Sequence, residues 1–146
     1  MNATLLGRLE ESCHELPLYL SHVRAGFPSP CEDHIEATLS LDELCIAHPA
    51  ATYLVRIRGD SLKDLSILDG DIAVVDRAVE ARKGMLVVAV VCGDFTAKIF
   101  ERECGLPVLR AANPAYPDIH LNEGDDLEVF GVVIGIVRTT RTGLVA

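Results

Sequence analysis

Short apolar runs separated by turn residues occupy the chain from Tyr53 onward. These runs are rich in Val and Ile and read YLVRI, DIAVVD, MLVVAVV, DFTAKIF, LPVLRA and LEVFGVVIGIV. Branched apolar residues in short runs bounded by turn residues are typical of β-strands. No helical stretch of about 10 to 15 residues lies between the runs, so a parallel α/β sheet is not expected. The pattern predicts a compact, mainly β domain made of curled antiparallel sheets.

Two local patterns predict individual elements. Gly93 lies between two apolar runs in VVAVVCGDFTAKI, which predicts a β-hairpin that turns at this glycine. Further upstream, Ser40 and Glu43 have the spacing of a helix capping box, and Pro49 follows them. We therefore expect a short helix over about residues 41 to 47.

Residues 1–40 differ from the rest because they show no sustained hydrophobic period. The segment HVRAGFPSPCED contains Gly26, which loosens the backbone, and two prolines, which bias their predecessors toward extended geometry. We expect an extended N-terminal arm over residues 1–40 and a β-rich domain over residues 41–146. Extended arms of this kind are where proteolysis concentrates.

Composition narrows the classes of partner. The 146 residues are 49% hydrophobic, which is enough for the core of one domain. The formal net charge of −9 argues against direct binding to nucleic acid or to an anionic membrane, because both require a basic surface. The longest apolar run, MLVVAVVC, is too short to span a bilayer, and charges interrupt the N-terminal segment. We expect a cytoplasmic protein whose partners are proteins.

The five cysteines indicate neither a disulfide framework nor a metal site. No two of them have CxxC spacing, and the five histidines form no ligand pair with them. We expect free, buried thiols, no bound metal and no cofactor.

The stretch RIRGDSLKDLSILDGD, residues 56–71, is compatible with several kinds of chemistry. Arg-Gly-Asp is an adhesion tripeptide only on an extracellular loop. Gly-Asp-Ser-Leu resembles the nucleophile block of an esterase family, but that family needs Asp-x-x-His, and His120 lies in DIH. Asp60 or Ser61 could cap a helix over the following run. Alternatively, Ser61 at a strand-to-helix junction could be a nucleophile beside backbone N–H groups that stabilise an oxyanion.

A serine nucleophile needs a base, and Lys98 in DFTAKIF is a candidate. In an extended strand, Thr96, Lys98 and Phe100 share one face. A free lysine has a pKa of about 10.4 and is a poor base at neutral pH. Burial disfavours the ammonium and lowers that pKa. The alternative is a strand lysine whose amine reaches solvent.

The order of these motifs resembles the self-cleaving LexA/UmuD family of bacterial DNA-damage proteins. The resemblance runs from about residue 23 to residue 138 and rests on GFPSP, HPAATY, RGDS, ILDGD, GDFTAK, NPAYP and EVFGVV. It implies that Ser61 is the nucleophile and that Lys98 is the neutral general base. It also implies that the scissile bond is Ala25–Gly26, in the chain's own arm, and that the Ser61 N–H contributes to an oxyanion hole. Leu62 stands where many relatives have Met, a volume-conserving change.

The resemblance further implies partners and a role. Members form homodimers, and RecA on single-stranded DNA stimulates their cleavage in the SOS response. The shortened product acts as the accessory subunit of an error-prone translesion DNA polymerase. A non-enzymatic polymerase-binding module with an inactive site is the main alternative. A DNA-binding repressor is not expected, because the 25 residues before the cleavage site are too few for the helix-turn-helix that it would need. A membrane signal peptidase is not expected either, because no apolar run is long enough for the membrane segment that it would need.

Overall fold

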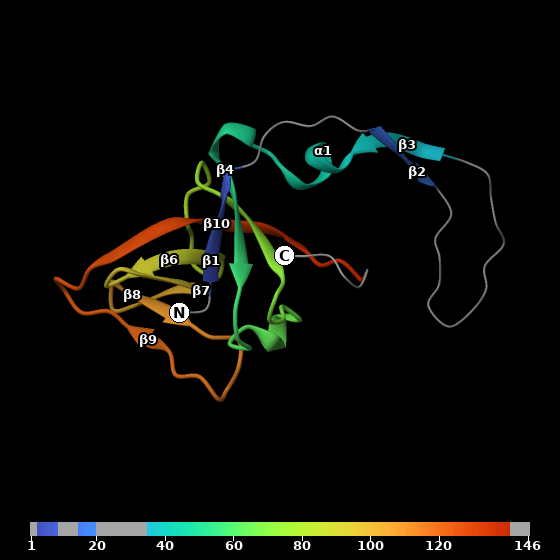
Figure 1. The fold of residues 1–146 in the computed structure, drawn as a ribbon. Helices are drawn as coiled ribbons and strands as arrows, with labels where there is room; N and C mark the ends of the chain where they lie inside the picture. Colours follow the sequence, from blue (N-terminus) through green and yellow to red (C-terminus); the bar gives the residue numbers. More distant parts are fainter. Residues whose placement is uncertain (1–2, 9–14, 20–34, 141–146) are drawn as a thin grey trace.

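The computed structural model describes residues 3–8, 15–19 and 35–140, and nearly all of their regular structure is β (Figure 1). The strands are β1 (Ala3–Arg8), β2 (Glu15–Tyr19), β3 (Ile35–Ser40), β4 (Thr52–Ile57), β5 (Ile72–Asp76), β6 (Leu86–Val91), β7 (Asp94–Glu103), β8 (Leu106–Arg110), β9 (Ile119–His120) and β10 (Leu127–Val137). One short helix, α1 (Leu41–Cys45), and two 3₁₀ helices, η1 (Pro49–Ala51) and η2 (Lys63–Leu65), connect them. Within these ranges no helix is long and apolar enough to cross a membrane.

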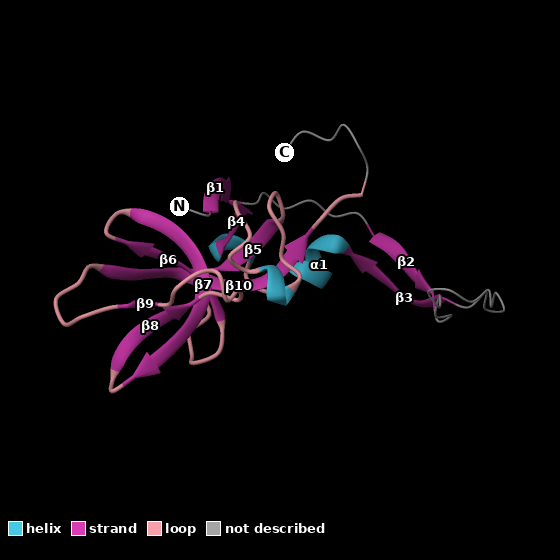
Figure 2. Ribbon diagram, turned by 90° about the horizontal axis from the view of Figure 1, so that it is seen from below, coloured by secondary structure: helices cyan, strands magenta, loops and turns pink. Residues whose placement is uncertain are grey.

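Eight strands form one antiparallel sheet, in the order β1-β4-β5-β10-β6-β7-β8-β9. The sheet is strongly curled, and its strands fan out from the centre of the molecule (Figure 2). The pair β2–β3 forms a separate two-stranded sheet that extends away from the large one (Figure 1). This architecture confirms the predicted mainly β fold with curled antiparallel sheets.

The core lies on both faces of the central strands. Val87 and Ala89 of β6 belong to one buried cluster, and Val88 between them belongs to the other. Successive residues of a strand point to opposite faces, so a strand buried on both sides needs a continuous apolar run. This is why MLVVAVV contains no alternation of polar and apolar residues.

The two predicted local elements are present. Helix α1 begins after Ser40, whose Oγ accepts a hydrogen bond from the Glu43 N–H at 2.9 Å, and it ends two residues earlier than predicted. The β6–β7 hairpin turns at Cys92 and Gly93, which have φ angles of 48° and 87°. Positive φ at both central residues is the signature of a type I′ turn, the form that matches strand twist.

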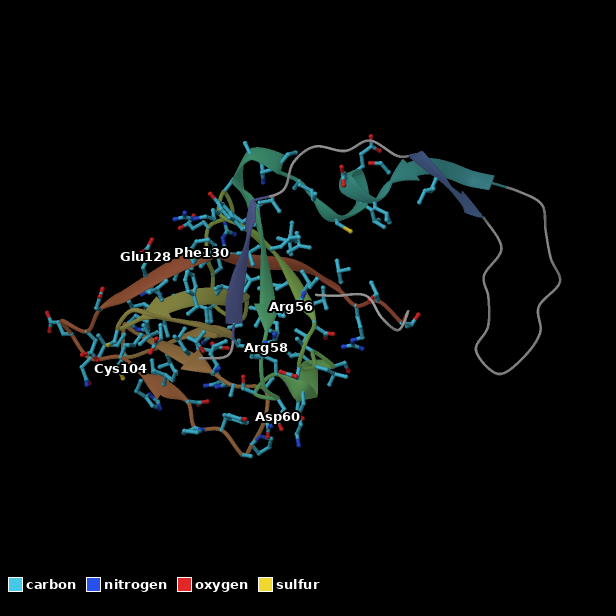
Figure 3. The ribbon with its side chains drawn as sticks, in the orientation of Figure 1. Arg56, Arg58, Asp60, Cys104, Glu128 and Phe130 are labelled. Carbon is cyan, nitrogen blue, oxygen red and sulfur yellow. The ribbon has the colours of Figure 1, made fainter. Side chains whose placement is uncertain are left out.

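The prediction that the cysteines are buried is wrong for part of the chain. Cys92 and Cys104 are exposed, and Cys45 is half-buried. Cys104, labelled in Figure 3, precedes Gly105 in the β7–β8 turn and has a φ of 50°. A central residue of a two-residue hairpin turn lies at the tip of the hairpin, where its side chain faces solvent. All three thiols are free, as expected.

The described parts of residues 1–40 form strands, which the sequence pattern did not predict. Strand β1 pairs with β4 and is an edge of the large sheet, and β2 pairs with β3. The β1–β4 pairing joins segments about 50 residues apart, so no local signal announces it. The division at residue 40 remains a prediction. The Ala25–Gly26 bond lies outside the described residues.

Candidate active site

Ser61 lies in the loop of residues 58–62 that follows β4, termed the Ser61 loop. Gly59 has a φ of 84°, a backbone conformation that side-chain-bearing residues rarely adopt, and its N–H donates to Asp69 Oδ1 at 2.7 Å. Beyond the serine, Leu62 and Ile67 are buried in the core. These two side chains anchor the loop, whereas Leu65 and Leu68 of the same run are exposed, and the glycine lets the chain turn away from the strand. Arg58 and Asp60 mark this course in Figure 3.

The helix-cap interpretation of this stretch is wrong. The run after Ser61 forms only the three-residue helix η2, whose N-cap is Leu62 with no side-chain cap hydrogen bond. Asp60 takes part through its backbone, because its carbonyl accepts from the Lys63 N–H at 3.2 Å. Ser66 then adopts a left-handed φ of 59° and ends the helix. The apolar run is thus a single anchored turn and not an amphipathic helix.

Lys98 extends from β7 into the interior and contacts Ser61. Its Nζ lies 3.2 Å from Ser61 Oγ, 3.0 Å from Thr96 Oγ1 and 3.2 Å from the carbonyl oxygen of Ala97. Lys98 is 6% exposed and Ser61 is 3% exposed. The alternative of a lysine whose amine reaches solvent therefore does not hold. The structure brings together the two residues that the sequence singled out, although they are 37 positions apart.

Burial lowers the pKa of Lys98 from 10.5 to about 8. The cause is desolvation, since the contacts of the amine described above are all with uncharged oxygens. A pKa about one unit above neutral leaves roughly a tenth of the molecules with an uncharged amine at pH 7. An uncharged amine 3.2 Å from a serine hydroxyl can accept its proton.

A surface cleft of about 490 Å³ opens over this pair. Ser61 and Lys98 line it together with the apolar side chains of Val91, Phe95 and Ile119. The remaining lining residues come from the Ser61 loop, from β7 and from the segment after β8, and they are Arg58, Gly59, Asp60, Asp94, Thr96, Tyr116 and Pro117. An extended peptide segment of mixed polarity suits a cleft of this composition.

Two further features of the site were not assigned a role from the sequence. The segment of residues 112–117 packs against the Ser61 loop, and its NPAYP motif was the signal that could have indicated this. Asp71, in the LDGD turn, is buried and paired with Arg138 at the end of β10, 67 residues later. Over the described part of the chain, no cluster of three or more His, Cys, Asp or Glu residues could hold a metal ion.

Comparison with known proteins identifies the family of the chain. The chain matches the family described as Peptidase S24-like over residues 17–134. It is 40% identical to protein SamA of Salmonella typhimurium over 86% of this chain and 87% of that protein. It is 39% identical to protein MucA of Escherichia coli over 82% of each chain. It is also 39% identical to the LexA repressor of Colwellia psychrerythraea, over 86% of this chain but only 59% of the repressor.

The mainly β fold with its cleft and the family match together define a peptidase-type protein. More particularly, the chain belongs to the Peptidase S24-like family, with SamA and MucA among its relatives of similar length. The LexA repressors are longer members that this chain spans in part.

Proposed function

We propose that the chain is a self-cleaving serine peptidase in which Ser61 attacks the chain's own Ala25–Gly26 bond and Lys98 is the general base. The observation that carries this proposal is the buried contact of 3.2 Å between Ser61 Oγ and Lys98 Nζ. The pKa of about 8 supports it, because an amine with that pKa is substantially uncharged in mildly alkaline solution.

The reaction proceeds in two halves. Neutral Lys98 accepts the hydroxyl proton while Ser61 Oγ bonds to the carbonyl carbon of Ala25, and the carbonyl electron pair moves to the oxygen. The tetrahedral oxyanion is stabilised by the Ser61 N–H. When the oxyanion collapses, the C–N bond breaks, and the Gly26 nitrogen leaves as an amine with the proton from Lys98. Water then gives a proton to Lys98 and attacks the ester carbon. The bond from that carbon to Ser61 Oγ breaks, Oγ takes the proton from Lys98, and a new carboxyl terminus is released at Ala25.

Gly26 suits the position after the scissile bond. Since it has no Cβ, the backbone of the arm can approach the buried serine closely. The arm, residues 1–40, would be the substrate segment, and residues 41–146 would be the peptidase domain.

We assign the protein a UmuD-like role in the bacterial SOS response. Similarity to SamA and MucA over most of both chains supports this role, whereas the chain spans only 59% of the LexA repressor. The protein acts in the cytoplasm as a homodimer, and RecA on single-stranded DNA stimulates its cleavage. The shortened product is the accessory subunit of an error-prone translesion DNA polymerase. The net charge of −9 favours contact with these proteins over direct binding to nucleic acid.

Intact mass measured against time at about pH 10 tests the reaction, because Lys98 is then mostly uncharged. Wild type should lose residues 1–25. Ser61→Ala should stay intact, and its thermal unfolding temperature should equal that of wild type. If wild type stays intact, the measurement is repeated with RecA on single-stranded DNA. Continued absence of cleavage would contradict the peptidase and favour the non-enzymatic polymerase-binding module.

A further inference from the structure

The segment of residues 112–117 holds the backbone on both sides of Ser61. The Ala112 N–H donates to the Ser61 carbonyl at 2.8 Å. The Asn113 Nδ2 donates to the Asp60 carbonyl at 2.9 Å. The Ala112 carbonyl in turn accepts from the Asp64 N–H at 2.8 Å. Both carbonyls that flank the serine are therefore fixed by a segment more than 50 residues away in sequence.

The Asn113 side chain is itself held in one orientation. It is 4% exposed, and its Oδ1 accepts from the Ala115 N–H at 3.0 Å. Since the oxygen is the acceptor in that contact, the NH₂ group must be the end that faces Asp60. A buried amide with both ends engaged has little freedom to rotate.

The contact with the Asp60 carbonyl fixes a second group, the N–H of Ser61. These two groups belong to the same peptide unit, and the described chain contains no cis peptide bond. In a trans peptide the C=O and the N–H point in opposite directions. Asp60 and Ser61 line the cleft, but Asn113 does not. The carbonyl points toward Asn113, and the Ser61 N–H therefore points away from Asn113.

We propose that Asn113 is a positioning residue for the oxyanion site: it orients the Asp60–Ser61 peptide so that the Ser61 N–H faces the carbonyl under attack. This inference rests on the proposed self-cleavage. Asn113 does not touch the reacting atoms and acts only through the peptide that it holds. Tyr116 supports the same unit from the surface, because its hydroxyl donates to Asp60 Oδ1 at 2.6 Å.

The test compares wild type, Asn113→Asp, Asn113→Ala and a control, Asn122→Asp, by intact mass over a range of pH. Asn113→Asp keeps the shape but removes the NH₂ donor, and Asn113→Ala removes the whole amide. Asn122 is an exposed residue in the turn before β10, and its backbone N–H is the group that bonds Asp125. All rates are taken at a temperature where circular dichroism shows each variant folded.

We expect both Asn113 variants to cleave about 10- to 100-fold more slowly than wild type across the pH range, since one oxyanion donor is misaligned. For Asn113→Ala, the apparent pKa of the rate should stay at the wild-type value, because the Lys98 contacts do not involve Asn113. Asn122→Asp should cleave at the wild-type rate.

Three results would overturn the inference while leaving self-cleavage intact. The Asn113 variants could cleave as fast as wild type. Asn113→Ala could shift the apparent pKa, which would mean that Asn113 acts on the base. The Asn113 variants could also slow no more than Asn122→Asp does. If instead wild type itself is uncut with the RecA filament, the proposed function fails, and the assignment of Asn113 fails with it.

Discussion

Two of the buried charged side chains, Asp71 and Lys98, lie in opposite electrostatic surroundings. Asp71 is 3% exposed, and Arg138 binds its carboxylate with two nitrogens, Nε at 2.6 Å and Nη2 at 2.5 Å. Lys98 is buried to a similar degree, but its amine contacts only uncharged oxygens. A buried group with a fully matched counter-ion stays charged, and one without a counter-ion is driven toward its neutral form.

Both pKa values are lowered, with opposite consequences. The hydrogen bond from Arg138 lowers the pKa of Asp71, which favours the charged carboxylate. Desolvation lowers the pKa of Lys98 to about 8, which favours the uncharged amine. Asp71 therefore stabilises the fold, since it joins the turn before β5 to the end of β10. Lys98 destabilises the fold at neutral pH, and under the proposed function the same burial supplies a base.

Replacing the buried lysine gives the largest expected effect. Lys98→Met keeps a similar volume and removes the charge, so cleavage should slow by about a thousandfold or more. The free energy of unfolding at pH 7 should rise by about 1 to 3 kcal/mol, because a pKa shift from 10.5 to about 8 reflects a penalty of that order. Intact mass and urea unfolding measure the two effects. If the variant were inactive and also less stable than wild type, the buried lysine would not be destabilising, and the contrast with Asp71 would fail.

The pH dependence of cleavage comes next in size. The uncharged fraction of an amine with a pKa of about 8 rises roughly 50-fold between pH 6 and pH 8 and then levels off. The self-cleavage rate should follow this curve. Rates from intact mass in buffers of constant ionic strength check it, and a flat profile would remove Lys98 from the role of base.

Stability should show the same titration. The unfolded state holds its lysine proton up to about pH 10.5, whereas the folded state loses it near pH 8. As pH rises through this window, the free energy of unfolding of wild type should therefore increase relative to that of Lys98→Met. Asp71 acts at the acid end: its contribution is present above its ordinary pKa of 3.8 and is lost as pH falls through the lowered value.

Neutralising the paired carboxylate should change the free energy of unfolding in the opposite direction to neutralising the lysine. Asp71→Asn keeps the shape but weakens the bonds to Arg138, and it should lower the free energy of unfolding by about 2 kcal/mol. Glu128→Gln is the matched control, because Glu128, labelled in Figure 3, is an exposed residue. It pairs with Arg77 at 3.6 Å. That change should stay within about 0.5 kcal/mol. Urea unfolding of both variants at pH 7 decides whether the pair with the buried carboxylate is the stronger one.

Removing one polar contact of the amine is expected to have the smallest effect. Thr96 Oγ1 lies 3.0 Å from Lys98 Nζ and stabilises its ammonium form. Thr96→Val should therefore lower the apparent pKa of cleavage further, by about half a unit. A shift to higher pH in the rate profile would show that Thr96 favours the neutral amine instead.

The parts of this molecule that could be predicted from the sequence are those with local signals. The Val-rich runs, the turn at Gly93 and the cap at Ser40 depend on neighbouring residues, and all three are present. The candidates Ser61 and Lys98 came from the order of motifs. Neither motif predicts the distance between the serine hydroxyl and the lysine amine, or the burial of that amine. Those depend on the packing of β7 against the Ser61 loop.

What was missed depends on long-range contacts. Three contacts join residues about 50 or more positions apart. They are the pairing of β1 with β4, the bond between Asp71 and Arg138, and the hydrogen bond from Asn113 to Asp60. The helix-cap interpretation failed for a related reason. Leu62 and Ile67 are both buried, and this holds the run after Ser61 in a single helical turn. The spacing of the apolar residues had instead indicated a longer helix.

The central place of the last strand has a consequence for how the protein is made. Strand β10 lies between β5 and β6 and is the strand that joins the part of the sheet carrying the Ser61 loop to the part carrying Lys98. A ribosome adds residues in order, so these two parts have no β10 to join them until residues 127–137 have left the exit tunnel. Until then, strand pairing cannot join the part of the sheet that carries the Ser61 loop to the part that carries Lys98. The proposed self-cleavage would then have to wait for the last strand of the described sheet.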